Sequence, residues 1–250
     1  MRRSIATVCL SGMLREKLQA AAAAGFDGVE IFENDLLQFP GSAAEVRRMA
    51  EDLNLAIDLF QPFRDFDAPD PAAFARNLAR AERKFDLMLE LGAPMMLVSS
   101  NASAHAIPDD ARAAAQLAAM ADRAAQRGLK LAYEAVAWGA HVKSYHDAWR
   151  IVKMADHPAL GLILDSFHTL AVGDDPGGFA DIPAEKLFHL QLSDAPRLDM
   201  DVRSIGRHFR CLPGQGALDV AGFAAAAVKA GYRGPLSLEV FNDELRAAPR

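Results

Sequence analysis

The sequence predicts a (β/α)8 barrel, also called a TIM barrel, that forms a single domain over residues 1–250. Eight short runs of apolar residues alternate along the chain with longer stretches of helical composition. The runs are almost continuously apolar, which is typical of parallel strands buried on both faces. A length of 250 residues is ordinary for one such barrel. We therefore expect strands and helices to alternate around one core.

The strands are expected in order at residues 4–9, 27–32, 55–60, 95–99, 129–134, 161–165, 187–192 and 235–240. Helices are expected at residues 13–24, 42–53, 71–91, 109–127, 144–155 and 217–230. Four helical stretches end at or near a glycine, where a helix commonly needs a left-handed residue, namely at Gly25, Gly92, Gly128 and Gly231. The segment "VGDDPGGFADIP" between the sixth and seventh strands predicts only a short helix.

Two segments depart from an even barrel. The connection from Ser193 to Ala217 is long for a loop between strand and helix, and long loops of this kind often carry function. About ten residues follow the eighth strand, so we expect the closing eighth helix to be short or missing. The chain is then either a naturally short barrel or the front part of a longer protein. A doubly wound open sheet is the alternative, but its first turn "CLSGML" lacks the G-x-G-x-x-G pattern.

Composition restricts the class of protein. Apolar residues make up 51% of the chain and charged residues 24%, as in soluble globular proteins, and no apolar run reaches the roughly 18 residues needed to span a membrane. The net charge of −6 argues against a nucleic-acid partner and suits a small-molecule substrate. Cys9 and Cys211 form no disulfide framework, so we expect a cytoplasmic protein. The sequence leaves homo-oligomer assembly open.

The ends of the last four expected strands carry oxygen-bearing side chains. They are Glu134 in "LKLAYE", Asp165 in "LGLILDSFHTL", Gln191 in "FHLQ" and Glu239 in "LSLE". In a barrel these ends face one mouth, where such enzymes place their chemistry. Three carboxylates that converge there would repel one another unless a cation lies between them. The all-oxygen donor set predicts one divalent ion, Mg²⁺ or Mn²⁺, with Co²⁺ tolerated.

Longer motifs carry a family resemblance over essentially the whole chain. They are "AGFDGVEIFENDLL", "LFQPFRDF", "LDSFHTL", "SDAPRLDMD" and "RHFRCLPGQG". They resemble the xylose-isomerase-like barrels of the sugar phosphate isomerase/epimerase superfamily, and within it the bacterial 3-dehydroshikimate dehydratases. The resemblance implies that Glu134, Asp165, Gln191 and Glu239 are metal ligands. It also implies a lyase that dehydrates 3-dehydroshikimate to protocatechuate in quinate and shikimate breakdown. Some such dehydratases keep a histidine where this chain has Val136.

A histidine near the metal ligands is the candidate base. His168 follows Asp165 by three residues, and its imidazole can titrate near neutral pH. We expect His168 to remove the proton alpha to the substrate ketone. His208, in the long loop, is a weaker rival for this role and a candidate substrate-binding residue.

Two arginines are candidates to bind the substrate carboxylate and so to assist catalysis. Arg64 follows the third strand, and Arg210 lies on the long loop after the seventh. A guanidinium can bind a carboxylate through two parallel hydrogen bonds. Glu33, at the end of the second strand, either hydrogen-bonds the substrate or holds a neighbouring arginine.

Two other activities are open to a barrel of this family. A sugar or keto-acid epimerase or isomerase would use the same cation, with Glu134 and Glu239 as an acid/base pair, and would not need a carboxylate-binding arginine. An abasic-site endonuclease would need a histidine-rich cluster of zinc ions and a basic face, and the sequence predicts neither. The fold alone does not separate the three activities.

Overall fold

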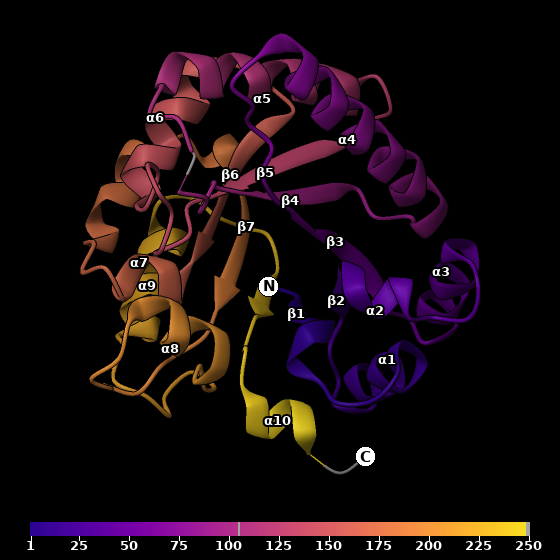
Figure 1. Ribbon diagram of the computed structural model, residues 1–250. Coiled ribbons are helices and arrows are strands. Elements are labelled where there is room, and N and C mark those ends of the chain that lie inside the picture. Colours follow the sequence, from indigo (N-terminus) through magenta and orange to yellow (C-terminus); the bar gives the residue numbers. More distant parts are fainter. Residues whose placement is uncertain (105, 249–250) are drawn as a thin grey trace.

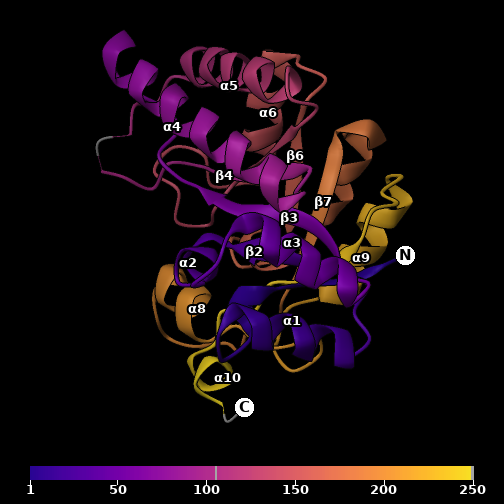
Figure 2. The ribbon, with the colours of Figure 1, turned by 90° about the vertical axis from the view of Figure 1, so that its right-hand side faces the viewer.

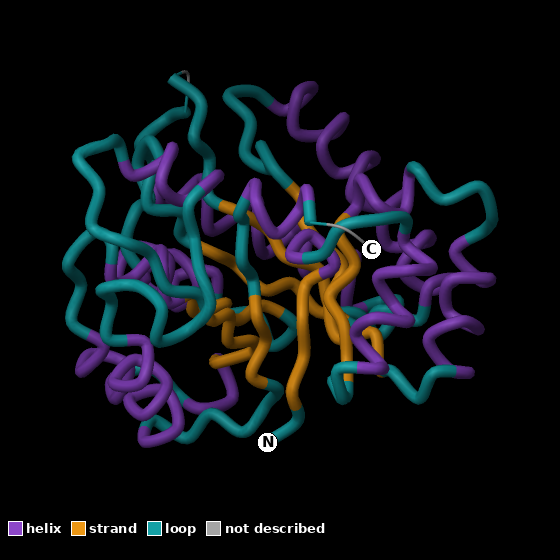
Figure 3. Tube along the Cα trace, turned by 90° about the horizontal axis from the view of Figure 1, so that it is seen from below, coloured by secondary structure: helices purple, strands orange, loops and turns teal. Residues whose placement is uncertain are grey.

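The eight predicted strands form one closed parallel barrel in chain order (Figure 1). The computed structural model describes residues 1–104 and 106–248. The strands are β1 (Arg3–Ala6), β2 (Gly28–Phe32), β3 (Ala56–Phe63), β4 (Met95–Ser99), β5 (Lys130–Glu134), β6 (Leu160–Asp165), β7 (Leu187–Leu192) and β8 (Leu236–Leu238). Figure 3 shows the strands at the centre and helices on either side of them. The predicted fold class is confirmed.

The expected helices surround the barrel (Figure 1). They are α1 (Leu14–Ala23), α3 (Ala43–Asp52), α4 (Pro71–Leu91), α5 (Asp110–Ala125), α6 (Tyr145–Ala155) and α9 (Val220–Lys229). α4 illustrates why they begin and end where they do. The Asp70 side chain accepts a hydrogen bond from the Ala73 N–H, Pro71 starts the helix, and Gly92 ends it at φ 77°. Local chemistry thus defines both ends of this helix.

Several short helices fill the connections between the larger elements. α2 (Glu33–Leu37) follows β2, and a 3-10 turn, η1 (Thr7–Cys9), replaces the end of the expected first strand. Between β6 and β7 lie α7 (Ser166–Leu170), η2 (Pro176–Asp181) and η3 (Ala184–Lys186), so the short structure predicted there is present. β8 is followed by α10 (Asp243–Ala247), which is five residues long, as expected for a short closing element.

The long loop after β7 contains a helix that the sequence analysis did not predict. It is α8 (Val202–His208), whose first turn is capped by the Asp201 side chain. Antiparallel bridges connect Asp194 with Cys211 and Phe209 with Asn242, so the loop is tied back to β7 and to the segment after β8. α8 and α10 therefore lie near one another at the same end of the barrel (Figure 2).

The interior of the barrel contains polar side chains as well as apolar ones. Most of the core is apolar and lies between the strands and the outer helices. Inside the barrel, however, Glu30, Gln61, His189 and Gln191 are all buried. Neither Cys9 nor Cys211 forms a disulfide. Across the described residues, we find no helix with the length and apolar character that a membrane crossing requires.

Candidate active site

The predicted strand-end residues are buried at the carboxyl ends of β5 to β8. Glu134 and Asp165 are the last residues of β5 and β6, Gln191 is the penultimate residue of β7, and Glu239 directly follows β8. Glu134 and Glu239 line a cavity of about 330 Å³. His168, Arg64 and other side chains discussed below complete its wall, so the structure brings most of the predicted site together at one mouth.

The carboxylates repel one another in this buried setting. Burial, together with the negative charges of Glu239 and Asp165, raises the pKa of Glu134 well above its usual value. Burial also raises the pKa of Glu239 to about 8, although the Arg210 guanidinium opposes the change. Glu134 Oε1 is buried and has no hydrogen-bond partner among the described residues. An unpaired buried carboxylate is costly, so its environment favours the approach of a cation.

Asp165 remains ionised because two donors stabilise its charge. Its Oδ1 accepts a hydrogen bond from the His168 N–H at 3.0 Å, where Asp165 caps α7, and its Oδ2 accepts one from Arg210 Nη1 at 2.8 Å. Burial alone would raise its pKa, but Arg210 and His168 outweigh burial and the pKa is lowered. The apolar strand thus ends on a charge that is paired.

Arg210 has other partners than the substrate carboxylate that we expected. Its guanidinium is 1% exposed, and Nη1 contacts Asp165 Oδ2 at 2.8 Å and Glu239 Oε2 at 3.2 Å. Nη2 lies 3.1 Å from His168 Nε2, and Nε donates to the Gly206 carbonyl at 3.0 Å. A guanidinium engaged on all three nitrogens cannot present an open fork to the substrate. Arg210 thus braces the strand-end carboxylates; it also lines the cavity, and its predicted role in binding the substrate carboxylate stays a prediction.

The Gln191 side chain is oriented by a buried glutamate. Gln191 Nε2 and Gln61 Nε2 each donate to Glu30 Oε2 at 2.7 Å, and His189 Nε2 lies 2.9 Å from Glu30 Oε1. A carboxylate can only accept hydrogen bonds, so the amide nitrogen of Gln191 must face Glu30. Gln191 Oε1 then has no hydrogen-bond partner in the described part of the chain. A free carbonyl oxygen of this kind is suited to bind a hard cation.

His168 lies in the wall of the cavity with donors at both ring nitrogens. The Ala137 N–H points at Nδ1 at 3.1 Å and Arg210 Nη2 at Nε2 at 3.1 Å, while the Trp138 ring packs edge-on at 4.9 Å. Burial lowers the pKa of His168 to about 3, so the ring is neutral at pH 7. A neutral imidazole offers a lone pair on one nitrogen and a proton on the other. Both neighbours can only donate, so the neutral ring can accept a hydrogen bond from just one of them.

The donor set fits a divalent cation. Ligand atoms of Glu134, Asp165 and His168 lie within 4.8 Å of one another. Once all three carboxyl groups are ionised, they leave two negative charges in excess over the single guanidinium of Arg210, which a divalent ion would neutralise. This geometric group shares Glu134 and Asp165 with the predicted ligand set, but it contains His168, which we expected to be the base. The predicted ligation by Gln191 and Glu239 stays a prediction.

The other predicted residues lie at the rim or outside the cavity. Arg64 is exposed and lines it. Glu33 forms an ion pair with Lys84 and lines a different pocket, so its charged partner is a lysine, whereas the two alternatives considered were the substrate and an arginine. His208 is exposed, contacts Asp243 at 2.8 Å and faces a neighbouring groove. His208 therefore does not line the cavity, and its role as a weaker rival base stays a prediction.

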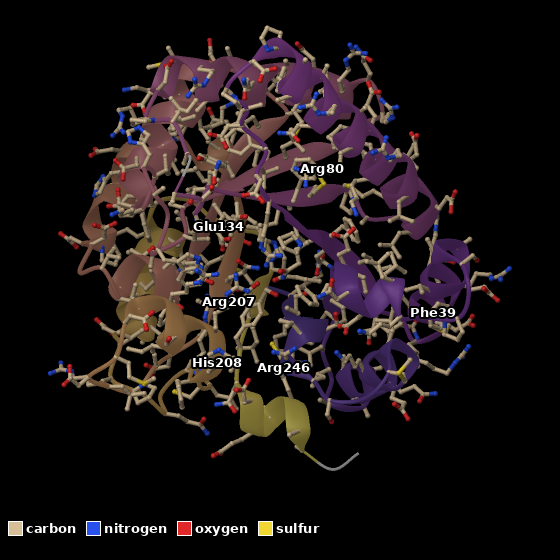
Figure 4. The ribbon with its side chains drawn as sticks, viewed as in Figure 1. Phe39, Arg80, Glu134, Arg207, His208 and Arg246 are labelled. Carbon is tan, nitrogen blue, oxygen red and sulfur yellow. The ribbon has the colours of Figure 1, made fainter. Side chains whose placement is uncertain are left out.

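Two arginines of α8 line the cavity and were missed in the sequence analysis. Arg203 and Arg207 are four residues apart, so they lie on one face of the helix. Arg207 lies over the Trp138 ring at 5.1 Å and over the Phe241 ring at 5.7 Å. Figure 4 shows Arg207 and Glu134 at the centre of the molecule. The helix-capping Asp201 in "DVRSIGRHFR" was the signal that would have predicted α8 and its arginine face.

A closed (β/α)8 barrel with buried carboxylates at its carboxyl mouth defines the class of TIM-barrel enzymes. A family model described as "Xylose isomerase-like TIM barrel" matches residues 18–250. The chain belongs to this family. The resemblance inferred from the sequence motifs is therefore confirmed at the level of the family.

Two curated relatives are similar along the whole chain. The 3-dehydroshikimate dehydratases of Pseudomonas aeruginosa and Pseudomonas putida are 61% and 58% identical to it over 249 residues. Each match covers 100% of this chain but only 39% of the relative. The chain therefore spans about two fifths of the length of these relatives. A 3-dehydroshikimate dehydratase of Neurospora crassa is 26% identical over 235 residues, covering 76% of this chain and 66% of the relative.

Solved structures agree with the fold. A xylose isomerase-like TIM barrel/4-hydroxyphenylpyruvate dioxygenase fusion protein matches with a TM-score of 0.97 at 58% identity, covering 100% of this chain and 40% of that protein. The IOLI protein, solved with a bound zinc atom, matches with a TM-score of 0.90 at 20% identity, covering 99% of this chain and 91% of that protein. The second likeness concerns the fold alone.

Proposed function

We propose that this chain is the catalytic domain of a metal-dependent hydro-lyase that converts 3-dehydroshikimate to protocatechuate. The two-sided cavity carries the proposal: buried oxygen ligands line its inner part, and the guanidiniums of Arg64, Arg203 and Arg207 line its rim. A ring compound with a carboxylate at one end and neighbouring oxygen functions at the other fits both sides. The two Pseudomonas dehydratases, similar along the whole chain, support this choice of substrate. The two free cysteines support a reducing, cytoplasmic location.

A divalent cation, Mg²⁺ or Mn²⁺ with Co²⁺ tolerated, is proposed to bind Glu134, Asp165, Gln191 and Glu239. The unpartnered Glu134 Oε1 and Gln191 Oε1 support this ligand set, as does the excess negative charge around them. When bound, the ion would act as a Lewis acid that stabilises negative charge developing on the ketone oxygen. Arg210 keeps the carboxylates in place by bridging Asp165 and Glu239.

The side chains around the cavity are assigned the two remaining tasks, which are proton removal and binding of the substrate carboxylate. His168, neutral at pH 7, removes the proton alpha to the ketone, for which Arg210 Nη2 must first move away from Nε2. The hydroxyl group beta to the ketone takes up one proton and leaves as water, and transfer of a further ring proton to the ketone oxygen produces the aromatic acid. Arg207, held between Trp138 and Phe241, binds the substrate carboxylate together with Arg64.

The test is to incubate the purified chain with 3-dehydroshikimate and Mg²⁺ or Mn²⁺ and to follow the ultraviolet absorbance of a catechol acid. We expect turnover that a chelator abolishes and that Mg²⁺, Mn²⁺ or Co²⁺ restores. Glu134→Gln, which keeps the shape of the side chain but loses its charge, is the matched inactive control. No absorbance change, together with metal-dependent epimerisation of a sugar or keto acid, would overturn the proposal in favour of the epimerase.

A further inference from the structure

A second hollow adjoins the active-site cavity. This outer groove has a volume of about 440 Å³ and is lined by Phe32, Asn34, Arg64, Arg203, Ser204, Arg207, His208, Phe241 and Arg246. It shares Arg64, Arg203, Arg207 and Phe241 with the cavity. Figure 4 shows Arg207, His208 and Arg246 near one another between α8 and α10. The outer groove thus extends the active-site mouth towards the short closing helix.

The outer groove concentrates positive charge in an acidic protein. The chain has a net charge of −6, yet four arginines line this one surface. Within residues 1–104 and 106–248, no ion pair neutralises any of the four guanidiniums. Of the two carboxylates that α10 contributes, Asp243 already contacts His208 at 2.8 Å. The positive charges therefore face the groove without an anion from the described chain.

Such a cluster is unfavourable unless an anion binds to it. Arg207 is half-buried, and its pKa is lowered by burial and by the neighbouring charges of Arg64, Arg203 and Arg210. Its guanidinium is nevertheless held in place by two aromatic faces, Trp138 at 5.1 Å and Phe241 at 5.7 Å. A pre-positioned guanidinium loses little conformational entropy when it binds a carboxylate. The cost of gathering these charges indicates a binding site.

We propose that the outer groove is a second anion site, which binds a carboxylate-bearing ring compound before it moves into the active-site cavity. The chemical class of this ligand rests on the proposed function, whereas the positive charge and the lining residues of the groove are independent of it. Arg246 and His208 belong to the groove alone, whereas Arg64, Arg203 and Arg207 face both hollows. A carboxylate can therefore pass from Arg246 to Arg207 without losing its cationic partners. Phe32 and Phe241 supply apolar wall for the ring.

Direct binding tests the site without any turnover. Metal-free protein is titrated with 3,4-dihydroxybenzoate, an aromatic carboxylate, by calorimetry. We expect two binding events for the wild-type chain and the loss of the weaker one in Arg246→Ala. Arg76→Ala is the matched control, because Arg76 is also exposed, on α4, but lies outside both hollows. A single binding event in the wild type, or two events that survive in Arg246→Ala, would overturn the second site.

Kinetics then tests whether the site captures substrate. Arg246→Ala is expected to lower kcat/KM by about 3- to 30-fold at low salt and to flatten its dependence on ionic strength. Arg76→Ala is expected to keep the wild-type salt dependence. If 3-dehydroshikimate is not turned over at all, the proposed function fails while the calorimetric result still stands. If it is turned over and Arg246→Ala keeps the wild-type kcat/KM at every salt concentration, the capture role is wrong.

Discussion

The strand-end carboxylates and the arginine rim lie next to each other but are built in opposite ways. Glu134, Asp165 and Glu239 are buried at the ends of strands, where backbone ladders fix them. Arg203 and Arg207 project from a seven-residue helix within a long loop. The candidate metal ligands are thus placed on the rigid barrel, and the side chains proposed to capture the ligand are placed on a short helix. In the proposed function, the arginine rim binds the carboxylate of the substrate and the strand-end residues bind the metal ion.

The first prediction concerns the buried side of this comparison and has the largest expected effect. His168→Ala should lower kcat by about 10²- to 10⁴-fold, the usual cost of removing a general base. Metal content, measured by atomic absorption, separates the two roles open to this residue. Unchanged metal content with lost turnover indicates a base. Lost metal would show that His168 is a ligand, because its ring lies within 4.8 Å of Glu134 and Asp165.

The second prediction compares the kinetic effects of replacing Arg207, in the arginine rim, and Arg210, among the strand-end carboxylates. Arg207→Ala should lower kcat/KM by about 30- to 1000-fold for the acid substrate and far less for its methyl ester, because a charge-assisted contact is lost. Arg210→Ala should lower kcat/KM for the acid and the ester alike. It should also reduce the free energy of unfolding by about 3–5 kcal/mol, since Asp165 and Glu239 lose their buried partner.

Urea denaturation and kinetics on both substrates measure these effects, and Arg76→Ala serves as the surface control. An acid-specific loss in Arg210→Ala with unchanged stability would show that Arg210 binds the substrate after all. Equal losses on the acid and the ester in Arg207→Ala would remove Arg207 from carboxylate binding.

A third prediction concerns the buried side chain that orients Gln191. Glu30→Gln should weaken metal binding by about 10- to 100-fold, because an amide in place of the Glu30 carboxylate no longer requires the amide nitrogen of Gln191 to face it. Calorimetry with Mn²⁺ on the metal-free variant measures the change, and Gln191→Ala is the reference. If metal binding weakens in Gln191→Ala but not in Glu30→Gln, Gln191 is a ligand whose orientation does not depend on Glu30. Unchanged binding in both would remove Gln191 from the ligand set.

The fourth prediction, with the smallest effect, follows from the raised pKa values. Glu239, with a pKa raised to about 8, carries a proton at pH 7 in the metal-free protein, and burial raises the pKa of Glu134 as well. A divalent ion must displace the Glu239 proton, so its affinity should fall as the pH drops below about 8. The expected change is about tenfold for each proton released per pH unit. Calorimetry in buffers of different ionisation enthalpy counts these protons, and a pH-independent affinity would contradict the prediction.

The sequence alone was sufficient for the barrel and for the position of its chemistry. Alternation of apolar runs with glycine-ended helices is a local pattern, so strands such as 95–99 and 187–192 were predicted to the residue. The carboxylates at the ends of β5 and β6 were found in the same way, because strand ends of a parallel barrel share one face.

Only the tertiary structure decided which polar groups meet. Arg210 was expected to face the substrate, but the bridges that fold its loop back onto the barrel bury it between Asp165 and Glu239. Glu30 and Gln191 are 161 residues apart, and their hydrogen bond depends on the closure of the barrel. Local sequence determines which elements form, because helix and strand preferences act over a few residues. Charge pairing acts across space, so the partners of each arginine were determined only when the chain closed into a barrel.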